Sequence, residues 1–141
     1  MSKRYIPIDV KRRVEEIANG YCEYCKSRDD FSTSFFEFDH IIAIAKGGTN
    51  EFNNIARSCG FCNGLKHDKI AGIDPITQKE YPLFNPRKNI WTDHFKWSDD
   101  FTKMIALTPI ARVTIQTLQL NRPTLINIRK ALLLLKKHPP K

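Results

Sequence analysis

The chain has 141 residues, of which 41% are hydrophobic and 27% are charged, and its formal net charge is +8. This length suits one domain with a modest core, and the composition excludes a disordered chain. The longest apolar run, at residues 131–135, is far shorter than the roughly 20 residues that a membrane-spanning helix needs. The first residues contain no apolar stretch like that of a secretory signal, so the sequence predicts a cytoplasmic protein without membrane contact.

The positive charge is concentrated at the two ends of the chain. Residues 1–13 have a net charge of +4, residues 14–71 of −3 and residues 72–141 of +7. Basic ends around an acidic centre are typical of polyanion binding, because each Lys or Arg near a phosphate releases counterions. The alternative is a solvated surface with an ordinary excess of charge. The charge pattern favours a nucleic-acid partner.

The first predicted element is a helix over residues 9–19. Asp9 is its expected N-cap, and Gly20 is expected to end it. Three apolar residues recur at helical spacing: Val10, Val14 and Ile17. Three basic residues are expected on its outer face: Lys11, Arg12 and Arg13.

The four cysteines come next, as two C-x-x-C pairs: Cys22, Cys25, Cys59 and Cys62. Two such pairs complete the tetrahedral four-sulfur shell of structural zinc sites. A closed shell leaves no open position, so we expect this zinc to hold the fold rather than to do chemistry. Disulfides are not expected without a secretion signal, and a thioredoxin-like redox site would leave the second pair unexplained.

The segment between the cysteine pairs carries residues suited to metal binding and proton transfer. "SFFEFDHI" (34–41) predicts a strand that brings Asp39 beside His40, and Gly47-Gly48 predicts a turn. Neighbours on a regular strand point to opposite faces. If both residues serve one site, either this strand ends, bulges or twists there, or a bound phosphate lies across its edge. A short helix is predicted over residues 62–72. Carboxylate and amide oxygens suit Mg²⁺ or Mn²⁺, and a neutral His suits general base work.

The C-terminal half contains predicted helices after a turn-rich stretch. Residues 74–88 predict a loop or extended wrap, and residues 100–108 predict a strand. Thr108 is expected to cap a helix that begins at Pro109 and runs to about residue 120. A last helix would carry one apolar face: Leu125, Ile128, Leu132 and Leu135. This face is expected to pack on the body of the protein, with a homodimer contact as the alternative. His94 is expected to pack beside two tryptophans, and His138 to be solvated.

The pattern "DH-x(6)-GG-x(5)-N" followed by "C-x2-CN-x2-K" resembles the HNH endonucleases, over about residues 20–70. Two later segments resemble the C-terminal extension of many bacterial members: "DPITQKEYPLFNPRKNIWTDHFKW" and "IALTPIARVTIQTLQLNRP". The resemblance implies an α+β protein with a ββα-metal HNH core stapled by the four-cysteine zinc site. It adds an N-terminal helix and a mostly helical C-terminal extension. The expected organisation is a core at residues 1–72 and an extension at 73–141, packed as one compact unit.

The resemblance also implies roles for individual residues. His40 matches the general base, Asp39 matches a ligand of a single catalytic Mg²⁺ or Mn²⁺, and Asn54 matches the Asn that steadies the histidine through the backbone. Its neighbour Asn53 is expected to be a turn residue. Asn63 matches a metal ligand that is often a second His, with a helix N-cap as the alternative.

Two further residues follow on the predicted helix. His67, four residues after Asn63, would share its helix face as a second ligand, a phosphate contact or a solvated residue. Lys66 is expected to contact a phosphate, with a solvated lysine as the alternative. The resemblance thus implies a metal-dependent DNA endonuclease. Four basic residues are expected to contact the backbone phosphates of the DNA: Lys66, Lys11, Arg12 and Arg13. The alternatives are a non-catalytic zinc-containing nucleic-acid-binding module, a protein-interaction domain, and RNA as the substrate.

Overall fold

The structure, a computed structural model, describes residues 5–141, which divide into two units. The first unit comprises residues 5–70 and 85–88, and the second comprises residues 71–84 and 89–141. Lys3 and Arg4 of the predicted basic N-terminal segment lie outside the described residues. Across residues 5–141, no helix has the length and apolar character needed to span a membrane. The domain boundary after residue 72 and a dimer contact through the last helix stay predictions.

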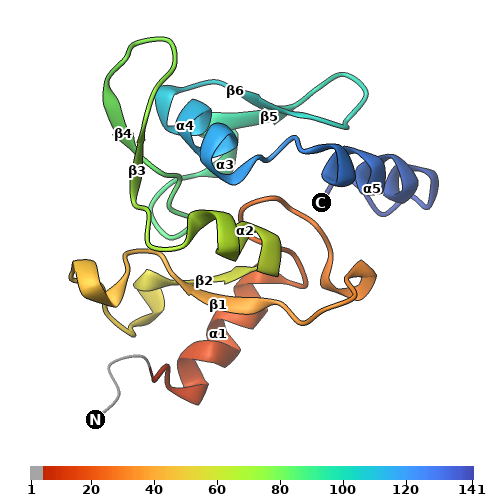
Figure 1. Ribbon diagram of the computed structural model, residues 1–141. Helices are drawn as coiled ribbons and strands as arrows, with labels where there is room; N and C mark the ends of the chain where they lie inside the picture. Colours follow the sequence, from red (N-terminus) through yellow and green to blue (C-terminus); the bar gives the residue numbers. More distant parts are fainter. Residues whose placement is uncertain (1–4) are drawn as a thin grey trace. The chain divides into compact units, whose positions relative to one another are not determined.

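The first unit is built on an antiparallel hairpin between two helices (Figure 1). Strand β1 (Glu37–His40) pairs with β2 (Ile55–Ser58), so that Asp39 lies opposite Ala56. Helix α1 (Ile8–Ala18) precedes the hairpin, and α2 (Gly60–Lys66) follows it. Three short 3₁₀ turns lie in the connections: Asp29–Phe31, Ile44–Lys46 and Phe52–Asn54.

Helix α1 packs its apolar face on the hairpin. Val14 is buried with Ile6 and Ile55, while Val10 and two phenylalanines surround them: Phe38 and Phe52. The buried positions continue to Ala18, and Ile17, which was predicted on this face, is exposed. The apolar face therefore follows the i, i+4, i+8 series rather than the predicted one. The helix also begins earlier than predicted, with Pro7 at the N-cap, so Asp9 lies inside its first turn, where a negative charge is favourable.

Helix α2 is shorter than predicted. It ends at Lys66, and strand β3 (Ala71–Ile73) occupies residues that were predicted to be helical. Cys59 is its N-cap, and the Cys59 Sγ accepts a bond of 3.4 Å from the Cys62 backbone N–H. Asn63 consequently lies within the helix, and the prediction that it might cap the helix was wrong.

The second unit contains two hairpins and three helices. Its elements are β3, β4 (Glu80–Pro82), α3 (Trp91–His94), β5 (Phe95–Trp97), β6 (Met104–Ala106), α4 (Pro109–Leu118) and α5 (Pro123–Leu134). Strands β3 and β4 form one hairpin, β5 and β6 the other. The first hairpin lies where a loop was predicted. Thr108 caps α4 as predicted, accepting a bond from the Ala111 N–H at 3.2 Å. The mixed α+β fold with an N-terminal helix and C-terminal helices is confirmed.

Polar side chains are buried in the second unit too. His138, predicted to be solvated, is buried, with its ring against Trp97 and its Nε2 2.8 Å from the Phe101 carbonyl oxygen. His94 packs edge-on against Phe84 and bonds to Thr108. These contacts join residues far apart in the chain, so no local pattern predicts them.

Candidate metal centre and active site

The four cysteines converge in the first unit. Their sulfur atoms all lie within 4.8 Å of one another, and all four residues are buried and free of disulfide bonds. The Cys25 and Cys59 sulfurs are 3.7 Å apart. Four sulfurs at the Zn–S distance of about 2.3 Å in a tetrahedron would be about 3.8 Å apart. Among residues 5–141, no other group of three or more His, Cys, Asp or Glu residues meets the same criterion. The cluster therefore fits a structural zinc ion.

The first cysteine pair carries two further residues that fasten it to its surroundings. The Glu23 carboxylate accepts the Arg57 backbone N–H at 2.9 Å and two bonds of 2.7 Å from the Arg87 guanidinium. The bond from Arg57 attaches the pair to β2, and the bonds from Arg87 attach it to residues 85–88. The adjacent Tyr24 side chain points to Asp39 and donates its hydroxyl hydrogen to Oδ2 at 2.7 Å. The segment that carries the first cysteine pair thus reaches directly to the predicted active-site acid.

Asp39 lies on the face of β1 turned toward α2 and is only 4% exposed. Besides Tyr24, its partner is the Lys66 ammonium, at 3.1 Å from Oδ2 and 3.3 Å from Oδ1. Burial raises the pKa of Asp39, against the opposing effects of the Lys66 charge and the Tyr24 bond. Burial also raises the pKa of Tyr24, and the Asp39 charge adds to that shift, so the phenol keeps its proton.

Lys66 lies inside the site rather than on its surface. It is 1% exposed, and its ammonium also donates to the His40 carbonyl oxygen at 3.0 Å. The sequence predicts a phosphate contact or a solvated lysine at this position, and the internal pair with Asp39 was not predicted. The structure shows instead that Lys66 ties α2 to the end of β1.

His40 is the last residue of β1, so the strand ends at the point where the sequence required an interruption. Its Nε2 lies 2.7 Å from the Asn50 Oδ1. Asn50 was absent from the predicted site, because nothing in its local sequence distinguishes it from other polar loop residues.

Asn54 holds the loop that connects the two strands. Its Oδ1 accepts from the Ile42 N–H at 2.8 Å, and its Nδ2 donates to the carbonyl oxygens of Ile42 at 2.9 Å and Thr49 at 2.8 Å. The loop passes so close that a Cβ on Gly48 would lie 1.7 Å from the Ile42 oxygen, which excludes any side chain there. Asn53 is exposed, so Asn54 is the one that braces the loop.

Asn63 faces β1 from helix α2. Its Nδ2 contacts the Oε1 of Glu37, the first residue of β1. Lys66, one turn further along α2, contacts Asp39 from the same side. Glu37 was not among the predicted site residues, although its place two residues before Asp39 in a strand predicts the same face.

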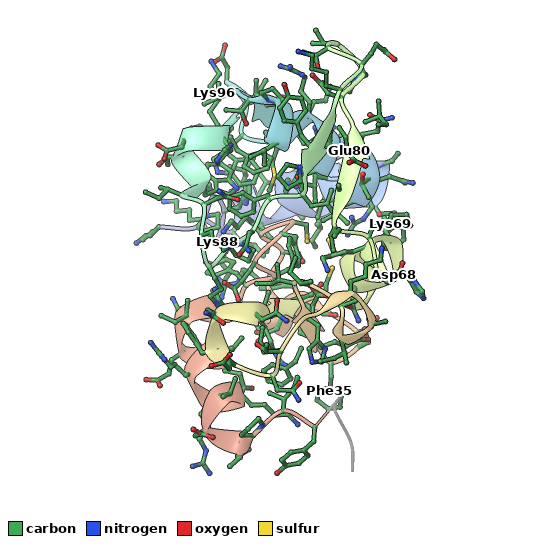
Figure 2. All side chains as sticks on the ribbon, turned by 90° about the vertical axis from the view of Figure 1, so that its left-hand side faces the viewer. Phe35, Asp68, Lys69, Glu80, Lys88 and Lys96 are labelled. Carbon is green, nitrogen blue, oxygen red and sulfur yellow. The ribbon has the colours of Figure 1, made fainter. Side chains whose placement is uncertain are left out.

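His67 is not part of this arrangement. Because α2 ends at Lys66 and His67 has a φ of 51°, the predicted face shared with Asn63 does not exist. The His67 side chain is 78% exposed, and its Nδ1 lies 3.1 Å from the Asp68 Oδ1. Figure 2 shows Asp68 pointing outward beyond α2. The prediction that His67 continues the helix face was wrong.

The basic residues of α1 lie on the other side of the hairpin. Figure 1 shows α1 and α2 on opposite sides of β1 and β2. The Lys11 ammonium lies 5.6 Å from the centre of the Phe38 ring, and the Arg13 guanidinium lies 3.8 Å from that of Phe52. Arg12 is exposed. The structure therefore does not bring these three residues to Asp39.

Comparison with protein families matches residues 22–69 to the family described as HNH endonuclease. The matched segment begins at the first cysteine and ends just beyond α2, about a third of the chain. No curated protein matches the chain. The matched residues contain all four cysteines, the β1–β2 hairpin and α2. Residues 22–69 are therefore similar to the HNH endonuclease domain.

Proposed function

We propose that this chain is a metal-dependent endonuclease that hydrolyses phosphodiester bonds of DNA, with His40 as the general base. The observation that carries the proposal is the contact of 2.7 Å between His40 Nε2 and Asn50 Oδ1, at the end of β1 and next to Asp39. An amide oxygen can only accept a hydrogen bond, so Nε2 donates, and in the neutral ring the lone pair is then on Nδ1. This is the protonation form that a general base needs.

In the proposed reaction, His40 Nδ1 takes a proton from a water molecule. The water oxygen attacks phosphorus in line with the 3′ oxygen, and the bond from phosphorus to that oxygen breaks. The 3′ oxygen takes a proton from solvent, which leaves a 5′ phosphate and a 3′ hydroxyl. Asn54 supports this step through the backbone, because its three bonds fix the loop that follows His40.

Asp39 and Asn63 are the proposed ligands of the catalytic metal. They lie on β1 and α2, which contact each other, and their oxygen donors suit Mg²⁺ or Mn²⁺. A divalent ion bound there would stabilise negative charge on the phosphate and on the leaving oxygen. Tyr24 and Lys66 orient the Asp39 carboxylate, and Lys66 also holds the His40 carbonyl.

The remaining residues have supporting roles in this proposal. The four-cysteine zinc is structural, because its shell has no open position. Lys11, Arg12 and Arg13 contact backbone phosphates away from the cleaved bond, since they lie on the α1 side of the hairpin.

The test is cleavage of supercoiled plasmid in the presence of Mg²⁺ by the wild type and by His40→Ala. We expect the wild type to cut and the variant to be slower by about a hundredfold or more. Zinc content and melting temperature establish that the variant is folded. A variant that cuts as well as the wild type would show that His40 is not the base. A wild type that binds DNA without cutting it would favour the non-catalytic zinc module.

A further inference from the structure

The proposed metal ligands carry little net negative charge. Asp39 is paired with the Lys66 ammonium at 3.1 Å, and both side chains are almost fully buried. Asn63 is a neutral amide. A divalent cation at Asp39 would therefore meet one carboxylate whose charge is already balanced. Because ligand charge is a main determinant of affinity for hard divalent cations, these groups alone make a weak site.

A second carboxylate, that of Glu37, lies on the same strand as Asp39. It lies two residues before Asp39, about 7 Å along the strand, and its side chain points to the same helix. It is exposed, whereas Asp39 is buried. Its Oε1 contacts the terminal amide of Asn63, which is itself a proposed ligand.

The contact between Glu37 and Asn63 brings a carboxylate and a side-chain amide together between β1 and α2. The amide turns its N–H toward the carboxylate, as any amide beside an anion does. A half-turn of the amide exchanges its nitrogen and oxygen, so that two oxygens face each other across the same gap. A hard cation would then have an anionic and a neutral oxygen donor there, with Asp39 on the same strand face.

We propose that Glu37 is a further ligand of the catalytic metal and supplies the negative charge that the Asp39–Lys66 pair does not. This inference rests on the proposed function. The competing explanation is that Glu37 only holds Asn63 by a hydrogen bond. Glu37→Gln separates the two, because glutamine keeps the acceptor oxygen for the Asn63 amide and removes only the charge.

The experiment is a titration of the zinc-loaded, full-length protein with Mn²⁺ in the absence of DNA, with free Mn²⁺ measured by electron paramagnetic resonance. The matched control is Glu51→Gln, which removes the same charge from another exposed position of the first unit. We expect Glu37→Gln to raise the Mn²⁺ dissociation constant about tenfold or more and Glu51→Gln to change it by less than about twofold. The melting temperature of Glu37→Gln should stay at the wild-type value.

Each other outcome has a definite meaning. If the wild type cuts plasmid and Glu37→Gln binds Mn²⁺ as tightly as the wild type, Glu37 is only a hydrogen-bond partner and the inference is overturned alone. If both glutamine variants weaken binding equally, the effect is one of overall charge, and the inference is again wrong. If the wild type neither binds Mn²⁺ nor cuts, the proposed function and the inference fall together.

Discussion

Each unit of the molecule buries one aspartate beside a cationic side chain, and the two pairs differ in how fully the carboxylate is satisfied. In the second unit, Asp74 accepts two bonds from Arg112, at 2.7 and 2.9 Å, and three more from the Ile76 and Thr77 backbone and the Thr77 hydroxyl. In the first unit, the side chains that donate to Asp39 among residues 5–141 are those of Tyr24 and Lys66. The Asp74 carboxylate thus accepts more hydrogen bonds than the Asp39 carboxylate does.

The electrostatic consequences have opposite signs. The bonds from Arg112 hold the pKa of Asp74 well below its usual range. Burial raises the pKa of Asp39 despite its cationic neighbour. A carboxylate with a full set of donors stabilises a fold, whereas one kept short of donors retains the capacity to bind something else. This difference is consistent with a structural role for Asp74 and with the proposed metal-binding role of Asp39.

Removal of zinc should produce the largest difference in stability between the two units. Structural zinc contributes an apparent 10–16 kcal/mol in small domains, about as much as the whole stability of a typical domain of roughly 5–15 kcal/mol. A chelator should therefore abolish hydrogen-exchange protection at Ile55 in β2 while protection at Val113 in α4 remains. Equal loss in both units would show that their stabilities are not separable.

Replacing each of the two aspartates by asparagine, in separate variants, should give two different phenotypes. Asp39→Asn should slow plasmid cleavage by about a hundredfold or more, because it removes the carboxylate that is proposed to hold the catalytic metal. Asp74→Asn should lower the melting temperature by several degrees and leave the cleavage rate unchanged. A cleavage defect in Asp74→Asn at a temperature where it is folded would contradict the assignment.

The variant Lys66→Met should show whether Lys66 acts as a buried partner of Asp39 or as a contact to DNA. Because the Lys66 ammonium is buried against Asp39 and the His40 carbonyl, we expect cleavage to slow by about tenfold or more. The affinity for DNA and its dependence on salt should not change. A loss of about one unit in the slope of log affinity against log salt would instead identify Lys66 as a phosphate contact.

Acid should affect the two aspartates with opposite signs, and this is the smallest expected effect. Asp74 contributes stability above its unfolded-state pKa of about 3.9, and this is lost as the pH falls through its depressed folded-state pKa. Asp39 has a raised folded-state pKa, so its ionisation costs stability as the pH rises through the interval from about 3.9 to that value. Melting temperatures of the wild type minus Asp74→Asn should therefore fall with acid, and those of the wild type minus Asp39→Asn should rise. Zinc content at each pH is the control, and slopes of equal sign would contradict the comparison.

The parts of this fold that the sequence predicts are those encoded by short, fixed spacings. All four cysteines occur in two C-x-x-C pairs, which left one simple arrangement for them. Thr108 followed by Pro109 predicts the start of α4, because both residues act within one turn. The strand ending at His40 follows from the same kind of local pattern.

The parts that could not be predicted depend on contacts between distant residues or on very short elements. The pair of Lys66 and Asp39 joins residues 27 apart, and a lysine on a helix gives no sign of whether it faces solvent or a buried acid. The hairpin of β3 and β4 has strands of three residues each, too short for an alternating pattern to be recognised. The positive φ of His67 follows from how α2 ends, and extending the helical period past that point misplaced the side chain.

The spacing of the two cysteine pairs sets the order in which the parts of the four-cysteine cluster are synthesised on the ribosome. Cys25 and Cys59 are 34 residues apart, so at about 5–20 residues per second the ribosome makes them about 2 to 7 s apart. Within that interval the residues of β1 are made first and those of β2 last, and helix α2, which covers Asp39, follows. Until residues 55–62 are made, the nascent chain therefore carries two of the four cysteines, and β1 has no partner strand. The complete set of four thiols becomes available just after both strands of the hairpin have been made, before the second unit is synthesised.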